Sequence, residues 1–219
     1  MKLNIAIIGA RGKMGASISK WLNDHTLILI HKENSLDELT NIDLAIEVTN
    51  SEHVLKNTQN LLKLKIPTIV GASGIKPSDY ERLSTQAETA CIPLWIIPNF
   101  SISAILMMMC AQKIAHHYSH CHIIEMHHPQ KLDAPSGTAK HTAWLIESTG
   151  GPKTQISSIR SPGIIADQHI LFATMGETLT IKHHTESREC YKPGVLMAVN
   201  HILQLSPKLH IGLEFLLSL

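Results

Sequence analysis

Short apolar, β-branched runs alternate with longer amphipathic stretches through the first hundred residues of this chain. The two kinds of segment have the lengths and periodicities of strands and helices. Such alternation favours an α/β fold in which a Rossmann-type parallel sheet is covered by helices. Strands are expected at Leu3–Ile8, Thr26–Ile30, Leu44–Val48, Thr68–Val70 and Leu94–Ile97, and helices at Gly12–Asn23, Ser51–Leu64 (with Ser51 as N-cap) and Pro77–Ala90 (with Pro77 near its start).

After about residue 120 the pattern changes to strand-rich segments with Gly163 and Gly176 as turn residues. We expect a second, α+β domain with an open mixed sheet over residues 102–192, and a first domain over 1–101 to which a C-terminal helix within about 193–219 returns. The expected elements are strands at Ile123–Met126, Ile156–Arg160, His169–Ala173 and Leu179–His183, and helices at Ser103–His117, Gly137–Glu147 and Pro193–Leu205.

A glycine-rich turn follows the first expected strand directly, with the residues Gly9, Ala10, Arg11, Gly12, Lys13, Met14 and Gly15. Glycines permit a tight turn and let backbone amides approach a pyrophosphate, whose charge is favoured at a helix N-terminus. The same residues fit a simple packing turn, but their position in a βαβ pattern favours dinucleotide binding by residues 1–101.

The nearby sequence His31-Lys32-Glu33 lies where Rossmann proteins contact the adenosine ribose. Glu33 can accept from a ribose hydroxyl, whereas Lys32 or Arg11 can pair with a 2′-phosphate, so NADH and NADPH both stay open.

Three further polar or small-residue segments begin where expected strands end. Because carboxyl ends of parallel strands share one edge of the sheet, these segments are expected to line the cofactor crevice, although Gly, Ser and Asn are also common in ordinary turns. They are Val48-Thr49, the run Gly71, Ala72, Ser73 and Gly74, and the run Ile97, Pro98, Asn99, Phe100 and Ser101.

The segment Glu125–Thr138 gathers acid and base groups between an apolar strand and a helix start. His127 and His128 can titrate near neutrality, and Lys131 can donate a proton or hold an anion. The amides at Ser136-Gly137-Thr138 favour a carboxylate or phosphate, while Asp133 is expected to fix the loop through local amides. The segment therefore predicts a site for a small, anionic substrate that exchanges protons.

The composition argues against several other classes of protein. A net charge of +1 with dispersed Lys and Arg gives no basic stripe for nucleic acid. No apolar run reaches the roughly 18 residues of a membrane span, and Met1–Gly9 resembles a strand rather than a signal peptide, so no membrane partner is expected. The cysteines are widely spaced without a CxxC pair, which indicates reduced thiols in a cytoplasmic protein: Cys91, Cys110, Cys121 and Cys190.

Paired histidines also raise the possibility of a metal site. No HxxxH with an acidic neighbour occurs at the spacing of catalytic zinc, and adjacent histidines on a strand point to opposite faces, so we expect no metal. The pairs are His116-His117, His127-His128 and His183-His184.

Six motifs spread along nearly the whole chain resemble those of 4-hydroxy-tetrahydrodipicolinate reductase, also called dihydrodipicolinate reductase, a family of lysine and diaminopimelate biosynthesis. They are GARGKMG at Gly9, IEVT at Ile46, GASG at Gly71, PNFS at Pro98, IIEMHHPQKLDAPSGTA at Ile123 and HHTESRECYKPGV at His183. Three departures accompany them: GASG replaces GTTG, Glu47-Val48-Thr49 replaces DFT, and Pro129 stands where a basic residue is common.

The resemblance implies roles for individual residues and for the two domains. His127 would be the catalytic proton donor or acceptor and Lys131 the proton donor, while His128, Gly137 and Thr138 would hold a small dicarboxylate. The dinucleotide would lie on Gly9–Met14, Gly71–Ser73 and Ile97–Phe100. The family's tetramers assemble through the sheets of their C-terminal domains, so a homotetramer is expected.

Two rival functions share some of these features. A sensor that binds a dinucleotide without turnover needs the glycine turn but has no use for His127 and Lys131 beside an anion-binding helix start. The second rival is another hydride-transfer enzyme, such as a semialdehyde or homoserine-type dehydrogenase. A semialdehyde dehydrogenase needs an active thiol, yet none of the four cysteines opens a helix beside a basic group. Both rivals are therefore weaker interpretations than a ring-reducing enzyme.

Overall fold

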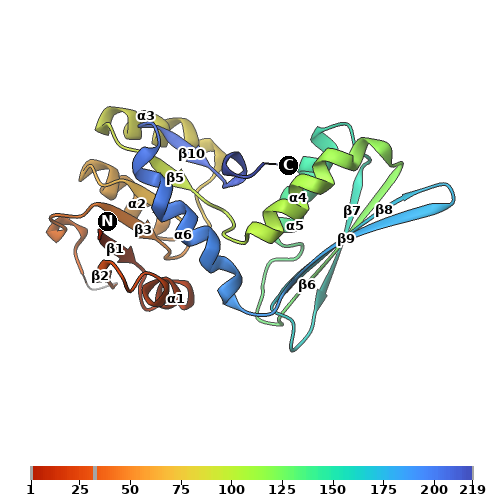
Figure 1. Ribbon diagram of the computed structural model, residues 1–219, viewed down its shortest axis with the longest axis horizontal. Helices are drawn as coiled ribbons and strands as arrows, with labels where there is room; N and C mark the ends of the chain where they lie inside the picture. Colours follow the sequence, from red (N-terminus) through yellow and green to blue (C-terminus); the bar gives the residue numbers. More distant parts are fainter. Residues whose placement is uncertain (1, 32–33, 219) are drawn as a thin grey trace. The chain divides into compact units, whose positions relative to one another are not determined.

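The computed structural model describes residues 2–31 and 34–218, and the chain forms two compact units (Figure 1). The first unit comprises Met1–Phe100 and Tyr191–Leu213, and the second comprises Ser101–Cys190 and Glu214–Leu219. The functional roles expected for residues 1–101 and 102–192 stay predictions.

The first unit contains a six-stranded parallel sheet in the order β10-β5-β4-β3-β1-β2. Its Rossmann-like arrangement confirms the expected α/β class. Its strands are β1 (Asn4–Ile8), β2 (Thr26–Ile30), β3 (Leu44–Glu47), β4 (Thr68–Val70), β5 (Leu94–Ile96) and β10 (Leu209–Ile211), and its helices are α1 (Lys13–Trp21), α2 (Val54–Lys63), α3 (Tyr80–Ala90) and α6 (Lys192–His201). Short 3-10 helices occupy Leu36–Glu38, Pro77–Asp79 and Ile202–Gln204.

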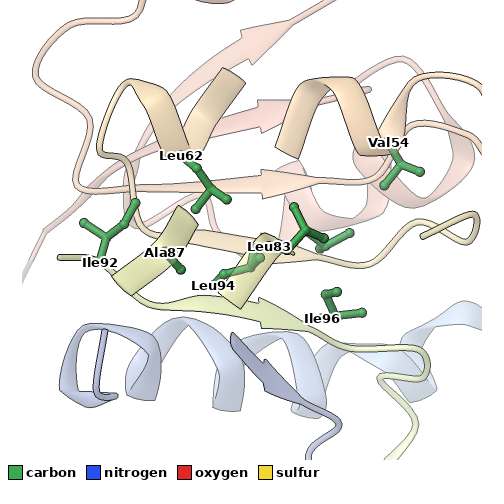
Figure 2. Packing of buried hydrophobic residues seen from close by; sticks show 8 residues of the cluster. Val54, Leu62, Leu83, Ala87, Ile92, Leu94 and Ile96 are labelled. Carbon is green, nitrogen blue, oxygen red and sulfur yellow. The ribbon is translucent and has the colours of Figure 1, made fainter. Parts of the chain in front are cut away.

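Helices α2 and α3 pack on one face of this sheet through a buried apolar cluster (Figure 2). Leu62 of α2 and Leu83 of α3 meet Leu94 and Ile96 of β5 there, because their apolar stripes face the strand. Alternate residues of β1 point to opposite faces, so Ile5 and Ile7 face the side of α1, which contacts β1 and α6. The sheet is therefore covered on both faces, as apolar parallel strands require.

The second unit contains a four-stranded mixed sheet in the order β7-β6-β8-β9, which confirms the expected open mixed sheet. β6 and β7 are parallel, whereas β8 is antiparallel to both β6 and β9. Helices α4 and α5 contact each other and cover one face, where Ile123, Ile170 and Phe172 are fully buried. The elements are α4 (Ile102–Ile114), β6 (His120–His127), α5 (Gly137–Ser148), β7 (Thr154–Arg160), β8 (Ala166–Thr174) and β9 (Glu177–Thr185), with 3-10 helices at Ala115–His117, Arg188–Tyr191 and Glu214–Leu216.

One expected helix start is wrong, and one strand of the structure was not expected. Ser51 is not the N-cap of α2, because Ser51 to His53 form a turn in which the Asn50 side chain accepts from the amides of Glu52 and His53. Helix α2 therefore begins only at Val54. Strand β10 was not predicted, since three half-exposed residues carry too little periodicity to be recognised.

None of the described helices is long and apolar enough to cross a membrane.

Candidate active site

The glycine turn closes on itself between β1 and α1. The amide of Gly12 donates to the carbonyl of Gly9 (2.9 Å), and the amides of Gly9 and Ala10 donate to Ile30 O at the end of β2 (3.1 and 3.4 Å). Gly12 is the N-cap of α1 and no side chain caps this helix start. The first-turn amides of α1 are therefore available to an anion.

Gly9 and Gly15 are required by close backbone approaches. Gly9 has φ +91°, and a Cβ there would lie 2.9 Å from Val48 O at the end of β3. A Cβ on Gly15 would lie 2.3 Å from Gly9 O, so only glycine lets α1 pack on the turn. The turn thus lies over the ends of β1 and β3, between which the strand order reverses and where open α/β sheets bind their ligands.

Gly12 has a different environment from these two glycines. It is exposed, and a Cβ there would meet only Gly9 O at 3.2 Å among the described atoms. The space beside it is open, which suits the approach of a pyrophosphate. Arg11 and Lys13 beside it are exposed, while Met14 is half-buried.

The segments expected to line the crevice after β4 and β5 lie side by side. A Cβ on Gly71 would be 2.5 Å from the Phe100 ring, so the glycine makes room for that ring. The amides of Gly71 and Ile97 donate to the ends of the neighbouring strands, at Glu47 O (2.9 Å) and Val70 O (2.8 Å). Several residues that follow the carboxyl ends of β4 and β5 are exposed or half-exposed: Gly71, Ala72, Ser73, Pro98 and Asn99.

Two residues proposed to read the ribose, Lys32 and Glu33, lie outside the described residues. His31 precedes them at the end of β2, and its buried Nδ1 has no hydrogen-bond partner among the described residues. The glycine turn, the start of α1 without a side-chain cap and the Nδ1 of His31 together fit a bound dinucleotide.

The polar segment of the second unit begins at the end of β6. Glu125 is fully buried on the helix-covered face of the sheet, and one of its oxygens lies 2.5 Å from Nδ1 of His127. Arg160, at the end of the neighbouring strand β7, donates from both terminal nitrogens to the Glu125 carboxylate (3.0 and 2.9 Å). The amide of Ser136 donates to the same carboxylate (3.2 Å), which ties the far end of the loop to β6.

The loop after His127 brings a cation to the start of α5. Lys131 Nζ donates to Asp133 (2.6 Å), and this contact, together with the nearby amide of Gly137, lowers the pKa of the Asp133 carboxyl. Ser136 is the N-cap of α5 and accepts from the amide of Ala139 (3.2 Å). Among the described atoms, none lies within 4 Å of where a Cβ on Gly137 would be, so a ligand can approach this helix start.

The other two expected substrate residues lie at the two ends of this loop. Nδ1 of His128 lies 3.0 Å from the Gln130 side-chain oxygen, and the amide of Lys131 donates to His128 O (3.0 Å). Thr138 is half-buried in the first turn of α5. The second unit thus brings together all five residues predicted for catalysis and substrate binding within one loop and helix start.

The ionisation of these groups follows from their surroundings. Burial opposes the charge of Glu125, but hydrogen bonds from Arg160, Ser158 and His127 outweigh it and hold the Glu125 pKa at about 2. Burial lowers the pKa of His127; the Glu125 carboxylate opposes this shift, and the cations Lys131 and Arg160 add to it. At neutral pH, Glu125 is therefore a carboxylate and His127 is a neutral imidazole.

Glu125 and Arg160 were not among the predicted site residues. A signal was present, because Glu125 shares its strand parity with the inward-facing Ile123, and a charged residue at a buried position needs a partner. The pairing of β6 with β7, which brings Arg160 opposite His127, could not be obtained from the spacing of the residues.

Within the described part of the chain, no group of three or more His, Cys, Asp or Glu side chains is placed to hold a metal ion.

Comparison with known proteins gives a consistent result. The family described as dihydrodipicolinate reductase matches this chain through its N-terminal part at residues 23–100 and its C-terminal part at residues 103–217. A 4-hydroxy-tetrahydrodipicolinate reductase from Legionella pneumophila (strain Corby) is 35% identical, with 99% of this chain and 100% of the relative covered. The enzyme of that name from Lysinibacillus sphaericus (strain C3-41) is 33% identical, with 98% and 99% covered.

A solved structure, dipicolinate-bound dihydrodipicolinate reductase from Paenisporosarcina sp. TG-14, matches with a TM-score of 0.80 and 28% identity over 99% of this chain and 100% of that one. Sequence and fold therefore agree over nearly the whole length, and the chain belongs to the dihydrodipicolinate reductase family.

Proposed function

We propose that this protein reduces 4-hydroxy-tetrahydrodipicolinate to tetrahydrodipicolinate with NADH or NADPH, in lysine and diaminopimelate biosynthesis. Family membership supports an oxidoreductase of this pathway. The related Paenisporosarcina enzyme is bound to dipicolinate, a planar dicarboxylate ring, which supports a small dicarboxylate as the substrate here.

One observation carries this proposal: the loop of the second unit holds the carboxylate of its own residue Asp133. Asp133 accepts from Lys131 Nζ, and the Gly137 amide adds to the lowering of its pKa; these are two of the groups that would hold or protonate the substrate. A carboxylate of the ring can use the same donors and the amide of Thr138, with His128 beside them. A lysine cation and a helix N-terminus together favour a dianionic ligand over a neutral one.

The reaction replaces a ring hydroxyl by hydrogen, which takes one hydride and one proton and releases water. When bound, the dinucleotide supplies the hydride. Lys131 is the proton donor, and His127 exchanges a proton or a hydrogen bond with the ring. Gly137 and Thr138 orient the ring through a carboxylate, so that the acid acts on a fixed atom.

The first unit would hold the dinucleotide through backbone groups. The amides of Gly9 to Met14 would bind the pyrophosphate at the start of α1, and the edges at Gly71–Ser73 and Ile97–Phe100 would line the nicotinamide half. Both NADH and NADPH are accepted in this proposal, since Glu33 favours one ribose form and Lys32 or Arg11 the other.

We also propose a homotetramer in the cytoplasm, assembled through the face of the second sheet opposite α4 and α5. Strand alternation places Ile124, Met126, Ile159 and Leu171 on that face, and each is at least partly exposed in the isolated chain. The four cysteines are unpaired thiols, which fits a reducing compartment. Light scattering at micromolar concentration tests the tetramer, and a monomer there would contradict it.

The activity is tested by following oxidation of NADH and of NADPH with freshly made 4-hydroxy-tetrahydrodipicolinate and identifying the product by mass spectrometry. We expect substrate-dependent oxidation, competitive inhibition by dipicolinate, and no effect of a chelator. Binding of dinucleotide without turnover would favour a sensor, and loss of activity with a chelator would favour a metal site. Either result would overturn the proposal.

A further inference from the structure

The ion pair formed by the buried Glu125 and the half-buried Arg160 contacts both ends and the middle of the loop that carries the proposed acid and base. Glu125 contacts His127 and the Ser136 amide, at the two ends of the loop. Arg160 donates to the backbone carbonyls of Lys131 (3.2 Å) and Asp133 (2.6 Å), in its middle. Neither residue lies on the loop itself, since one belongs to β6 and the other to β7.

We propose that Glu125 and Arg160 are positioning residues for the reaction. Glu125 fixes His127 in the tautomer whose Nε2 is a hydrogen-bond and proton acceptor, and Arg160 holds the loop in the conformation that presents Lys131. This inference rests on the proposed function, because it assigns how the acid and the base of that reaction are prepared.

The tautomer follows from the hydrogen-bonding capacities of the two side chains. An ionised carboxylate can only accept, so the 2.5 Å contact requires that Nδ1 of His127 carries the proton. In a neutral imidazole the other nitrogen, Nε2, then has a free lone pair. His127 is therefore prepared to accept, which leaves the ammonium of Lys131 as the donor.

The role of Arg160 follows from its geometry. Its planar guanidinium has five donors in a rigid fork, and here they reach two carboxylate oxygens and two loop carbonyls at the same time. A lysine ammonium has the same charge but cannot make this set of contacts. The loop that carries Lys131 therefore depends on the shape of the Arg160 side chain and not only on its charge.

The first test measures the dependence of kcat/KM on pH in Glu125→Gln. Glutamine can accept from or donate to Nδ1, so the tautomer of His127 is no longer fixed. We therefore expect kcat to fall roughly 10- to 100-fold, which is the usual cost of losing a group that orients a functional imidazole. The carboxylate raises the pKa of His127, so its removal should move the acidic limb of the profile to lower pH. Glu147→Gln is the matched control, because Glu147 accepts a backbone amide at the other end of α5 (2.8 Å) and should leave rate and profile unchanged.

The second test separates positioning from folding. Arg160→Lys should lower kcat/KM at least about tenfold with unchanged dinucleotide affinity, since only the loop of the second unit is affected. The double variant Glu125→Gln/Arg160→Met removes the buried carboxylate together with its half-buried cation, so neither charge is left unpaired and it should unfold at higher denaturant than Glu125→Gln or Arg160→Met alone. Its activity should nevertheless stay as low as that of Glu125→Gln.

A direct measurement of the tautomer comes from NMR of the protein labelled with ¹⁵N-histidine, in which the signals absent from His127→Asn identify His127. We expect the proton on Nδ1 in the parent and a mixture in Glu125→Gln. A parent with the proton on Nε2, an unchanged pH profile in Glu125→Gln, or a double variant that regains activity together with stability would each overturn the inference. A parent enzyme that does not reduce the ring would instead overturn the proposed function.

Discussion

The glycine turn of the first unit and the loop from His127 to Thr138 in the second differ in what they offer a ligand. The first offers backbone amides in a turn that glycines let close tightly, with Gly9 and Gly15 packed against backbone and Gly12 exposed. The second offers side chains, held by hydrogen bonds from the ion pair of the buried Glu125 with Arg160. The first region should therefore be damaged by adding atoms, and the second by removing them.

Two fully buried carboxylates among the described residues, Glu125 and Glu47, show the same contrast. Glu125 has a guanidinium partner and a pKa of about 2, so it keeps its charge in the interior. Glu47, at the end of β3, accepts from Thr49 and from Asn57 (3.1 Å), and burial raises its pKa. A buried carboxylate paired with a cation can organise charged chemistry, whereas one held by neutral donors serves local structure.

The largest effect is expected from removing the acid of the second region. Lys131→Ala should lower kcat by about two to four orders of magnitude, the usual contribution of a positioned general acid, while dinucleotide affinity stays unchanged. Steady-state kinetics and calorimetry measure the two quantities. Lys140→Ala, an exposed lysine on α5, is the matched control.

His127→Ala should cost a similar factor, and the double variant much less than the product of the two losses, because both side chains serve one proton-transfer step. Full activity in Lys131→Ala would mean that the loop is only a scaffold and that water supplies the proton.

Adding atoms to the first region should have the next largest effect. Gly12→Val should weaken dinucleotide binding by about 100-fold, or roughly 2.7 kcal/mol, while the free energy of unfolding falls by no more than about 1 kcal/mol. The reason is that Gly12 is exposed and a Cβ there meets only Gly9 O at 3.2 Å among the described atoms, whereas the ligand needs the space beside it. Calorimetric titration with both dinucleotides and denaturant unfolding measure the two quantities.

Gly15→Ala is the matched comparison, because its Cβ would lie 2.3 Å from Gly9 O inside the fold. It should lower the free energy of unfolding by about 1–3 kcal/mol, the usual cost of overpacking. Unchanged dinucleotide affinity in Gly12→Val would make the turn a packing feature only.

The sequence predicted the glycine turn and the helix start at Ser136, but it did not predict the contacts of Arg160, and the reason is physical. The glycine turn and the helix start at Ser136 are local features, so residue type and spacing were enough to predict them. The contacts of Arg160 depend on the parallel pairing of β6 with β7, which joins residues 35 positions apart in the Glu125–Arg160 pair. Long-range register of this kind leaves no local pattern.

The misplaced start of α2 and the unpredicted β10 have local causes. Ser51 is a residue type that caps helices, but the side chain of Asn50 closes a turn over Glu52 and His53, so the helix begins only at Val54. The three residues of β10 form a strand because β5 offers an unpaired edge, as shown by the amide of Gly212 donating to Ile96 O (2.9 Å). Tertiary context, rather than propensity, determines both elements.

A smaller effect is expected for the choice between the two dinucleotides. The catalytic efficiencies with NADH and NADPH should differ by less than about tenfold, or roughly 1.4 kcal/mol, because opposed charges at Lys32 and Glu33 partly cancel as selectors. Parallel assays with both cofactors give the ratio. A much larger ratio in either direction would show that one of these side chains does not contact the ribose.

The smallest effect is expected at Glu47, and it tests whether the two buried carboxylates really differ. The raised pKa of Glu47 means that the folded protein holds this proton more tightly than the unfolded chain does. Its contribution to stability is therefore complete below the unfolded pKa and is lost as the pH rises through the folded pKa. Above the folded pKa the buried, ionised group is a cost.

Glu47→Gln should accordingly raise the free energy of unfolding at about pH 8, by at most about 1 kcal/mol, since the amide oxygen of glutamine can still accept from Asn57 and from the Thr49 hydroxyl. The advantage should shrink toward about pH 5, because the parent carboxyl takes up its proton as the pH falls. Glu88→Gln, an exposed carboxylate on α3 bonded to Ser84, should show no such trend. Denaturant unfolding at both pH values measures these differences. If Glu47→Gln were less stable at the higher pH, Glu47 would be acting as a stabilising anion, and its contrast with Glu125 would be wrong.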